Sequence, residues 1–66
     1  MQLQINGQAK QFSNSPTVAG VIAQFTKDSS KIIAELNGNI IPTSDWEKTS
    51  VKEGDAIELV SFVGGG

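Results

Sequence analysis

The stretch "GDAIELVSFVGGG", residues 54–66, decides the fold expected for this chain of 66 residues. Gly54 lies in a polar turn, and the apolar and polar side chains that follow alternate, which is typical of a β-strand with one buried face. Ile57 and Leu59 are expected to face the core, and Glu58 to face water. The glycines at the end bury no side chain and cost the most backbone entropy to order.

The N-terminal residues predict the strands that the final strand joins. In "MQLQI", residues 1–5, every second residue is apolar, which predicts a strand with one buried face. Asn6-Gly7 is a two-residue hairpin signal, and "QAKQF", residues 8–12, is the weakly patterned returning strand of a sheet edge. Because the final strand follows a long connection, we expect it to pair beside the first strand, in the centre of the sheet.

A helix is predicted between the two halves of the chain. Thr17 is one possible N-cap, and Ser15 with Pro16 at the first helical position is the alternative. The helix runs to about Thr26, and Gly20 inside it indicates close packing against the sheet. The apolar residues at helical spacing form the face that we expect to be buried: Val18, Val21, Ile22 and Phe25.

The second half begins with "KIIAELNG", residues 31–38, a strand that ends in a second hairpin signal. A short strand, "NIIP", ends at Pro42. Ser44 or Thr43 then caps a short helical turn from which Trp46 packs inward. The order of the elements predicts one α+β domain, with a mixed sheet of four to five strands packed on one helix.

Composition limits the classes of function. The chain has no cysteine and no histidine, and five basic against seven acidic side chains give a formal charge of -2. It therefore offers no thiol nucleophile, disulfide or thiolate ligand, and we expect no metal site and no nucleic-acid or membrane partner. No apolar stretch is long enough to span a bilayer, and no secretory signal is visible, which favours a cytoplasmic protein.

Catalysis by the chain alone is not expected. The acidic residues form no paired motif, and so short a chain has little room to enclose a substrate. We interpret Asp55 and Glu58 as turn and solvent residues, Trp46 as a core residue, and Lys10 and Lys31 as solvated.

Several stretches together resemble one known family: "SPTV" at 15–18, "AELNGNIIP" at 34–42, the Trp46 turn, "EGDAIELVSFV" at 53–63 and the terminal "GGG". This pattern is similar to the ThiS family, the bacterial sulfur carrier proteins of thiamine biosynthesis, over essentially the whole chain. The resemblance implies a ubiquitin-like β-grasp fold. It also divides the chain into one domain, residues 1–63, and a flexible C-terminal glycine tail, residues 64–66.

The resemblance implies that the carboxylate of Gly66 is the working group. An ionised carboxylate is a poor electrophile, so a partner adenylyltransferase of the ubiquitin-activating type would consume ATP to adenylylate it. A sulfur donor system would then convert it to a thiocarboxylate, and a thiazole synthase would accept the sulfur. The chain itself would bind no cofactor. Gly64 and Gly65 would bind the partner by threading a channel too narrow for side chains.

Val60 and Phe62 are the other candidate partner-binding residues. They alternate with Ile57 and Leu59 and should lie on the exposed face just before the tail, where an apolar patch would suit docking. The alternative is that Phe62 folds back onto its own sheet.

Other interpretations stay open at this point. The small subunit of molybdopterin synthase shares the fold and the terminal glycines, but is usually longer and tends to carry proline before them. Ubiquitin-like modifiers are longer still. A β-grasp binding module without C-terminal chemistry is also possible. Taken alone, three terminal glycines are as typical of a frayed end or a cloning remnant as of a functional tail.

Overall fold

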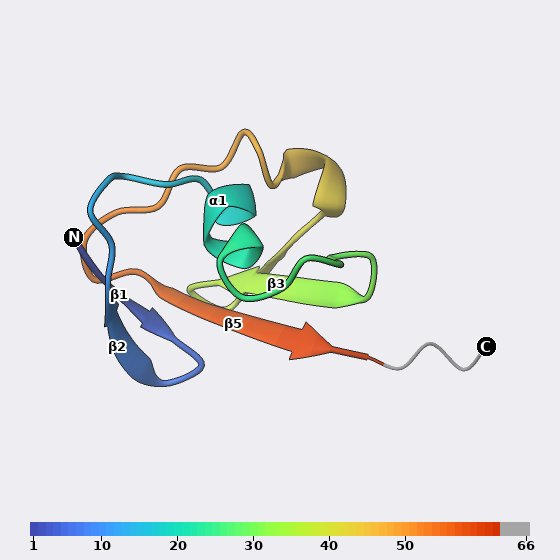
Figure 1. The fold of residues 1–66 in the computed structure, drawn as a ribbon, viewed down its shortest axis with the longest axis horizontal. Helices are drawn as coiled ribbons and strands as arrows, with labels where there is room; N and C mark the ends of the chain where they lie inside the picture. Colours follow the sequence, from blue (N-terminus) through green and yellow to red (C-terminus); the bar gives the residue numbers. More distant parts are fainter. Residues whose placement is uncertain (63–66) are drawn as a thin grey trace.

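The computed structural model describes residues 1–62. Five strands form one sheet, which packs against one short helix (Figure 1). In chain order the elements are β1 (Gln2–Ile5), β2 (Gln8–Gln11), α1 (Val18–Ala23), β3 (Ile32–Leu36), β4 (Asn39–Ile41), the 3-10 turn η1 (Thr43–Asp45) and β5 (Ala56–Ser61). The predicted order of elements and the α+β class are confirmed.

The last strand lies at the centre of the sheet. The strand order is β2-β1-β5-β3-β4, and β5 runs parallel to β1, with Gln4 opposite Ala56. The other neighbouring strands are antiparallel. The sheet is therefore mixed, and the predicted pairing of the final strand beside the first is confirmed. In Figure 1, α1 and the connection from η1 to β5 lie on the same face of the sheet.

Both Asn-Gly pairs form the predicted hairpin turns. Asn6 has a φ of 53° and Gly7 a φ of 83°, while Asn37 and Gly38 have φ values of 51° and 89°. Positive φ at both central residues is the geometry of the two-residue turn that matches the twist of antiparallel strands. These local signals set the β1–β2 and β3–β4 hairpins.

The core lies between α1 and the sheet. The buried apolar side chains are Leu3, Ile5, Phe12, Val18, Val21, Ile22, Ala34, Trp46, Val51 and Ile57. They come from both halves of the chain, so burial of apolar surface joins the two hairpins, the helix and β5 into one unit.

The helix is shorter than predicted. Thr17 is its N-cap, because the Thr17 Oγ1 accepts a hydrogen bond of 3.2 Å from the Gly20 N–H. It ends at Ala23, not near Thr26, since the Phe25 N–H donates to the Ile22 carbonyl three residues before it, a tighter turn than that of an α-helix. Phe25 lies beyond the last helical residue, and its side chain is 46% exposed. The predicted burial of Phe25 is wrong.

Two smaller predictions are corrected. A Cβ on Gly20 would lie 3.3 Å from the Pro16 Cβ, so Gly20 packs against the segment that leads into the helix and not against the sheet. Neither Thr43 nor Ser44 caps η1, whose N-cap position is Pro42 without a side-chain hydrogen bond. Trp46 is 5% exposed, which confirms its placement in the core.

Within residues 1–62, none of the helices is long and apolar enough to cross a membrane.

Candidate functional site

β5 connects the folded body to the glycines on which the functional interpretation depends. The predicted site residues Gly64, Gly65 and Gly66 lie outside the described residues, as does Val63. Their roles stay predictions. The described part of the site is therefore β5 and the residues around it.

The start of β5 is held by a buried acid and an asparagine. Asp55 is 8% exposed. Its carboxylate accepts hydrogen bonds from the Lys52 N–H at 2.8 Å and from the Asn37 Nδ2 at 3.1 Å. The Asn37 Oδ1 in turn accepts from the Ala56 N–H at 2.9 Å. The predicted turn position of Asp55 is confirmed, and its carboxylate is buried in that turn.

A second turn asparagine holds the middle of β5. The Asn6 N–H donates to the Ile57 carbonyl at 2.9 Å, and the Asn6 Oδ1 accepts from the Leu59 N–H at 2.8 Å. Both turn asparagines therefore bond the backbone of β5 with their side chains. Sequence reasoning found Asn6 and Asn37 as turn residues but missed this second role, because it depends on strands distant in sequence.

The sheet face opposite α1 carries exposed apolar side chains, which we call the apolar band: Ile33, Ile40, Val60 and Phe62. Val60 is 50% and Phe62 44% exposed, on the face where the alternation places them. Ile33 lies directly opposite Val60 on the neighbouring strand. Phe62 continues the ladder, since its N–H donates to the Lys31 carbonyl at 2.9 Å.

Ile33 and Ile40 were missed as members of this surface. Ile40 lies opposite Glu35, and Glu35 is two residues after Ile33 on β3, so its side chain is on the same face. Ile33 and Ile40 are therefore diagonal neighbours on that face. The signal was available in the sequence, because the Asn37-Gly38 turn fixes this register. Glu35 also lies opposite Glu58, which gives the band an acidic neighbour.

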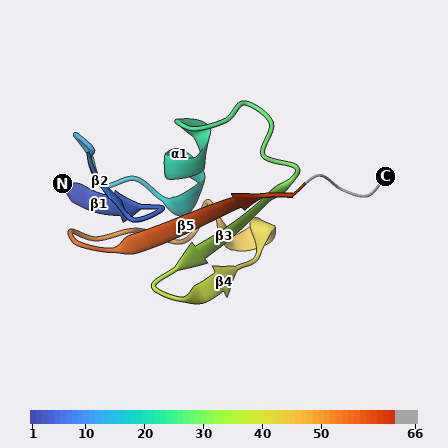
Figure 2. The same cartoon turned by 90° about the horizontal axis from the view of Figure 1, so that it is seen from below.

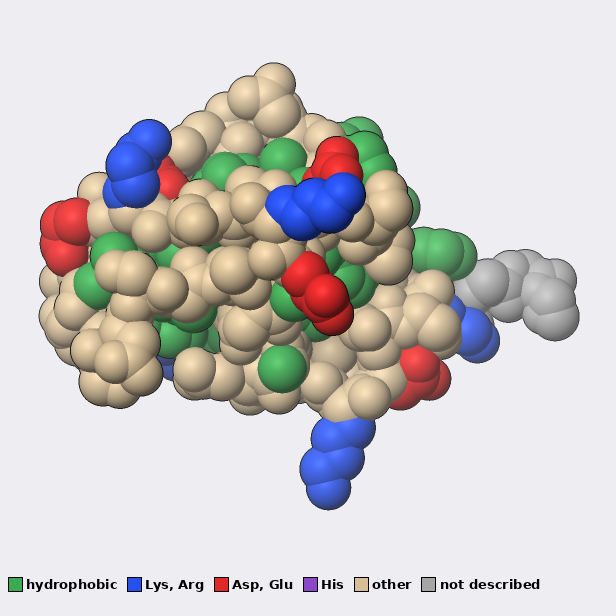
Figure 3. Space-filling view, turned by 90° about the horizontal axis from the view of Figure 1, so that it is seen from above, with side chains coloured by type: hydrophobic (Ala, Val, Ile, Leu, Met, Phe, Trp, Pro, Cys, Tyr) green, Lys and Arg blue, Asp and Glu red, His purple; other side chains and the backbone are tan. Residues whose placement is uncertain are grey.

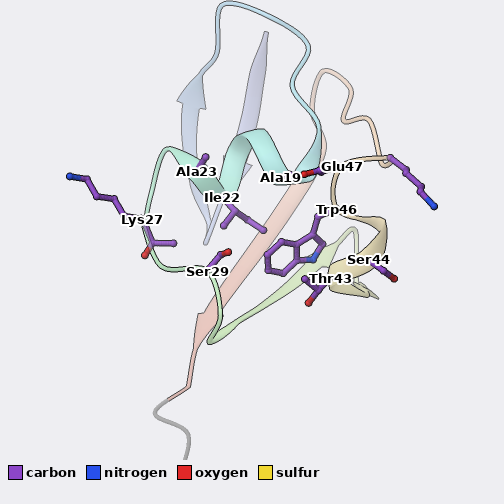
Figure 4. A pocket seen from close by; sticks show the side chains of 11 residues that line it. Ala19, Ile22, Ala23, Lys27, Ser29, Thr43, Ser44, Trp46 and Glu47 are labelled. Atoms are coloured by element: carbon purple, nitrogen blue, oxygen red, sulfur yellow. The ribbon is translucent and has the colours of Figure 1, made fainter.

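The helix side of the molecule differs from this band. Figure 3 shows that side as mostly polar, with basic and acidic side chains scattered among small apolar areas. A groove of about 510 Å³ lies there between α1 and the segment around η1. Figure 4 shows the Trp46 indole directed toward Ile22, with Lys27 extending away from them. The groove brings together none of the predicted site residues, and among residues 1–62 no three acidic side chains cluster as metal ligands would.

Comparison with known proteins identifies the family. The model of the ThiS family matches residues 3–66, which include the glycines. The chain belongs to the ThiS family. A crystal structure of the thiamine biosynthesis protein ThiS from Geobacter metallireducens matches with a TM-score of 0.85 and 32% identity, over 100% of both chains. The ubiquitin-like β-grasp fold expected from the sequence is confirmed.

Relatives of the same family and one larger protein are also similar. The sulfur carrier protein ThiS of Bacillus subtilis is 32% identical, over 97% of this chain and 98% of its own length. That of Escherichia coli is 30% identical over 100% of both. A thiazole synthase from Paramagnetospirillum magneticum is 41% identical over the whole chain, which spans only 20% of that protein.

Proposed function

We propose that this chain is a sulfur carrier of thiamine biosynthesis, a protein cosubstrate and not itself an enzyme. The observation that carries the proposal is the family match over residues 3–66, because it includes both the β-grasp body and the glycines. Its relatives in Bacillus subtilis and Escherichia coli, which it matches over nearly their full lengths, are sulfur carrier proteins.

The reacting group in this proposal is the carboxylate of Gly66. It attacks the α-phosphorus of ATP in the partner's active site, which releases pyrophosphate and leaves an acyl-adenylate. A sulfide-level nucleophile from the donor system then forms a carbon–sulfur bond, and AMP departs with the carbon–oxygen bond pair. The product is a thiocarboxylate. Adenylylation is needed because AMP is a far better leaving group than the oxide of a free carboxylate.

The composition of the chain suits this division of labour. It contains no cysteine, so no side-chain thiol competes for the activated acyl group by forming an internal thioester. The adenylyltransferase supplies the ATP site and the donor system supplies the sulfur. The likeness of the whole chain to part of a thiazole synthase supports such an enzyme as the acceptor.

The apolar band is the proposed docking surface for the activating enzyme. Val60 and Phe62 are half-exposed and directly precede the residues that would enter the partner, and Ile33 extends the surface onto β3. Exposed apolar patches of this kind mark interfaces. The neighbouring Glu35 and Glu58 predict a basic side chain on the facing surface of the partner.

The test is the mass of the reaction product. The chain is incubated with its cognate adenylyltransferase, ATP and a sulfide donor, and intact mass spectrometry follows. We expect a gain equal to the replacement of one oxygen by one sulfur, mapped by fragmentation to Gly66. A gain that maps to an internal residue, or no gain with an enzyme proven active on another carrier, would contradict the proposal.

A further inference from the structure

β5 is longer than the strand that lies beside it. β1 pairs with β5 at two positions, Gln4 opposite Ala56 and Ile5 opposite Ile57, whereas β5 continues to Ser61. Figure 2 shows β5 running past the end of β1 in the direction of the C-terminus. The last part of β5 therefore has β3 on one side and no strand on the other.

The backbone groups on this open side can be assigned from their neighbours. The Ile57 carbonyl points toward the β1 side, where it accepts from the Asn6 N–H, while the Phe62 N–H points toward β3. Successive residues of a strand alternate in this direction, so Leu59 and Ser61 point to the same side as Ile57. The Leu59 N–H already donates a hydrogen bond to the Asn6 Oδ1. Within residues 1–62, the Leu59 carbonyl and both backbone groups of Ser61 have no hydrogen-bond partner.

A groove adjoins this edge on the helix side of the sheet. It has a volume of about 320 Å³ and is lined by Asn6, Phe25, Thr26, Ile32, Leu59 and Ser61. Phe25 forms part of the wall of this groove, and its side chain is 46% exposed. It lies just after the end of α1 at Ala23. Unpaired strand groups thus lie beside a hollow whose lining includes three apolar side chains, those of Phe25, Ile32 and Leu59.

We propose that this edge accepts an extended segment of the activating enzyme as an additional strand, with one apolar side chain of that segment in the groove. The proposal rests on the proposed function. An added strand bonds main chain to main chain and places alternate side chains in pockets. Here the Leu59 carbonyl and Ser61 supply the main-chain bonds, and Phe25, Ile32 and Leu59 supply the pocket.

The position of the edge points to that partner. Gly66 is the fifth residue after Ser61, and this stretch of chain spans at most about 17 Å. An enzyme that holds Gly66 in its active site therefore has its own surface within reach of the edge. A second copy of the chain fits less well, because Asn6 closes the edge at Leu59 and so short a pairing is too weak to hold two sheets together.

Hydrogen exchange tests the pairing directly in the wild-type chain. The 15N-labelled chain is measured by NMR with and without the purified cognate adenylyltransferase. We expect exchange of the Ser61 N–H to slow by at least roughly tenfold in the complex, because pairing removes it from water. The matched control is the Ala9 N–H, which points to the free edge of β2 on the far side of the sheet and should not change.

Proline substitution tests the same bond through activity. Ser61→Pro removes the free N–H and should raise the KM for the chain in ATP–pyrophosphate exchange by roughly tenfold, with kcat within about twofold. Ala9→Pro removes a matched N–H on the other edge and should leave both constants unchanged. Phe25→Ser should raise the KM in the same way without lowering the midpoint of thermal unfolding.

The outcomes separate the two proposals. Unchanged Ser61 exchange in the complex, or wild-type KM for a folded Ser61→Pro, would overturn the strand addition and leave the carrier function standing. The exchange of Ser61 could instead slow as the concentration of the chain rises, without the enzyme. That result would assign the edge to a second copy of the chain and would also overturn strand addition by the enzyme. A wild-type chain that binds the enzyme but is never adenylylated would overturn the carrier function alone.

Discussion

At the scale of single residues, the buried carboxylate of Asp55 shows how the start of β5 is fixed. A buried acid is costly unless its oxygens are hydrogen-bonded, and here one oxygen accepts from Asn37 and the other from the Lys52 N–H. The same asparagine bonds Ala56. The network links the second hairpin to β5, so the direction in which the strand leaves the turn depends on two side chains.

Asp55→Ala should therefore destabilise the fold by about 1–3 kcal/mol, because it leaves the partners of the carboxylate unpaired. Urea unfolding followed by tryptophan fluorescence measures the change, since Trp46 is the one tryptophan of the chain. Glu58→Ala is the control: Glu58 is exposed, and its removal should change stability by less than about 0.5 kcal/mol. Equal stability of the two variants would mean that the network contributes nothing.

Asp28 offers a second test at this scale. The Ser30 hydroxyl and, to a smaller degree, the Ser30 N–H donate to its carboxylate and lower the pKa of Asp28. A lowered pKa in the folded state contributes stability above the unfolded pKa, and this contribution is lost as the pH falls through the folded pKa.

Ser30→Ala should raise the pKa of Asp28 toward its ordinary value, because the main cause of the shift is removed. NMR titration of the Asp28 carboxyl carbon measures it. The matched control is Ser29→Ala, which deletes a neighbouring hydroxyl that does not bond Asp28. A pKa that stays fixed in Ser30→Ala, or that moves equally in both variants, would contradict the assignment.

At the scale of elements, local signals were sufficient for the strands and the two hairpin turns. Alternation placed Leu3 and Ile5 on one face, and the two Asn-Gly pairs fixed both hairpins. The end of the helix could not be found in this way. Phe25 continues the helical spacing of Val21 and Ile22, but the chain tightens after Ala23, and the resulting exposure of Phe25 depends on hydrogen bonds that spacing does not record.

The functional face was only half predictable for a related reason. The alternation of residues along β5 predicts that Val60 and Phe62 are exposed. Ile33 and Ile40 belong to the apolar band because their strands pair beside β5 and β3, which alternation within one strand does not show. The free edge at Ser61 could not be predicted at all, because it depends on where β1 ends relative to β5.

Val60→Asp and Phe62→Asp test the apolar band. Both side chains are half-exposed, so a charge there should leave the fold close to wild type and raise the KM for the activating enzyme. Ile57→Ala is the contrasting variant: its side chain is fully buried, so it should lose about 2–5 kcal/mol of stability. Circular dichroism and pyrophosphate exchange measure the two effects. Unfolding of the aspartate variants would place Val60 and Phe62 in the core.

At the scale of the whole molecule, the core and the proposed reacting group are far apart in the sequence. Among residues 1–62 the buried side chains come from residues 3–57, while Gly66 lies nine residues beyond Ile57 in the sequence. Deleting Gly65 and Gly66 should therefore leave the thermal midpoint almost unchanged and abolish adenylylation. Differential scanning calorimetry and pyrophosphate exchange measure the two. A clear fall in the midpoint would show that the glycines contribute to the stability of the body.

The remaining question at this scale is why the residues at the end are glycines. If the tail passes through a narrow channel of the enzyme, a Cβ occupies channel width and removes the positive φ values open to glycine. Gly65→Ala should then lower kcat/KM for pyrophosphate exchange, and Gly65→Val should lower it far more. Gly64→Ala should be milder, because residue 64 lies nearer the channel mouth.

Stability provides the control for this series, since position 65 lies beyond β5 and all variants should unfold at the wild-type temperature. We expect kcat/KM to fall from the wild type to Gly65→Ala and further to Gly65→Val, while stability stays constant. Such a fall would follow the width of the side chain and would identify a steric limit in the enzyme. Equal rates for the three proteins would mean that adenylylation requires only the terminal carboxylate. The glycines would then need a different explanation from passage through a channel.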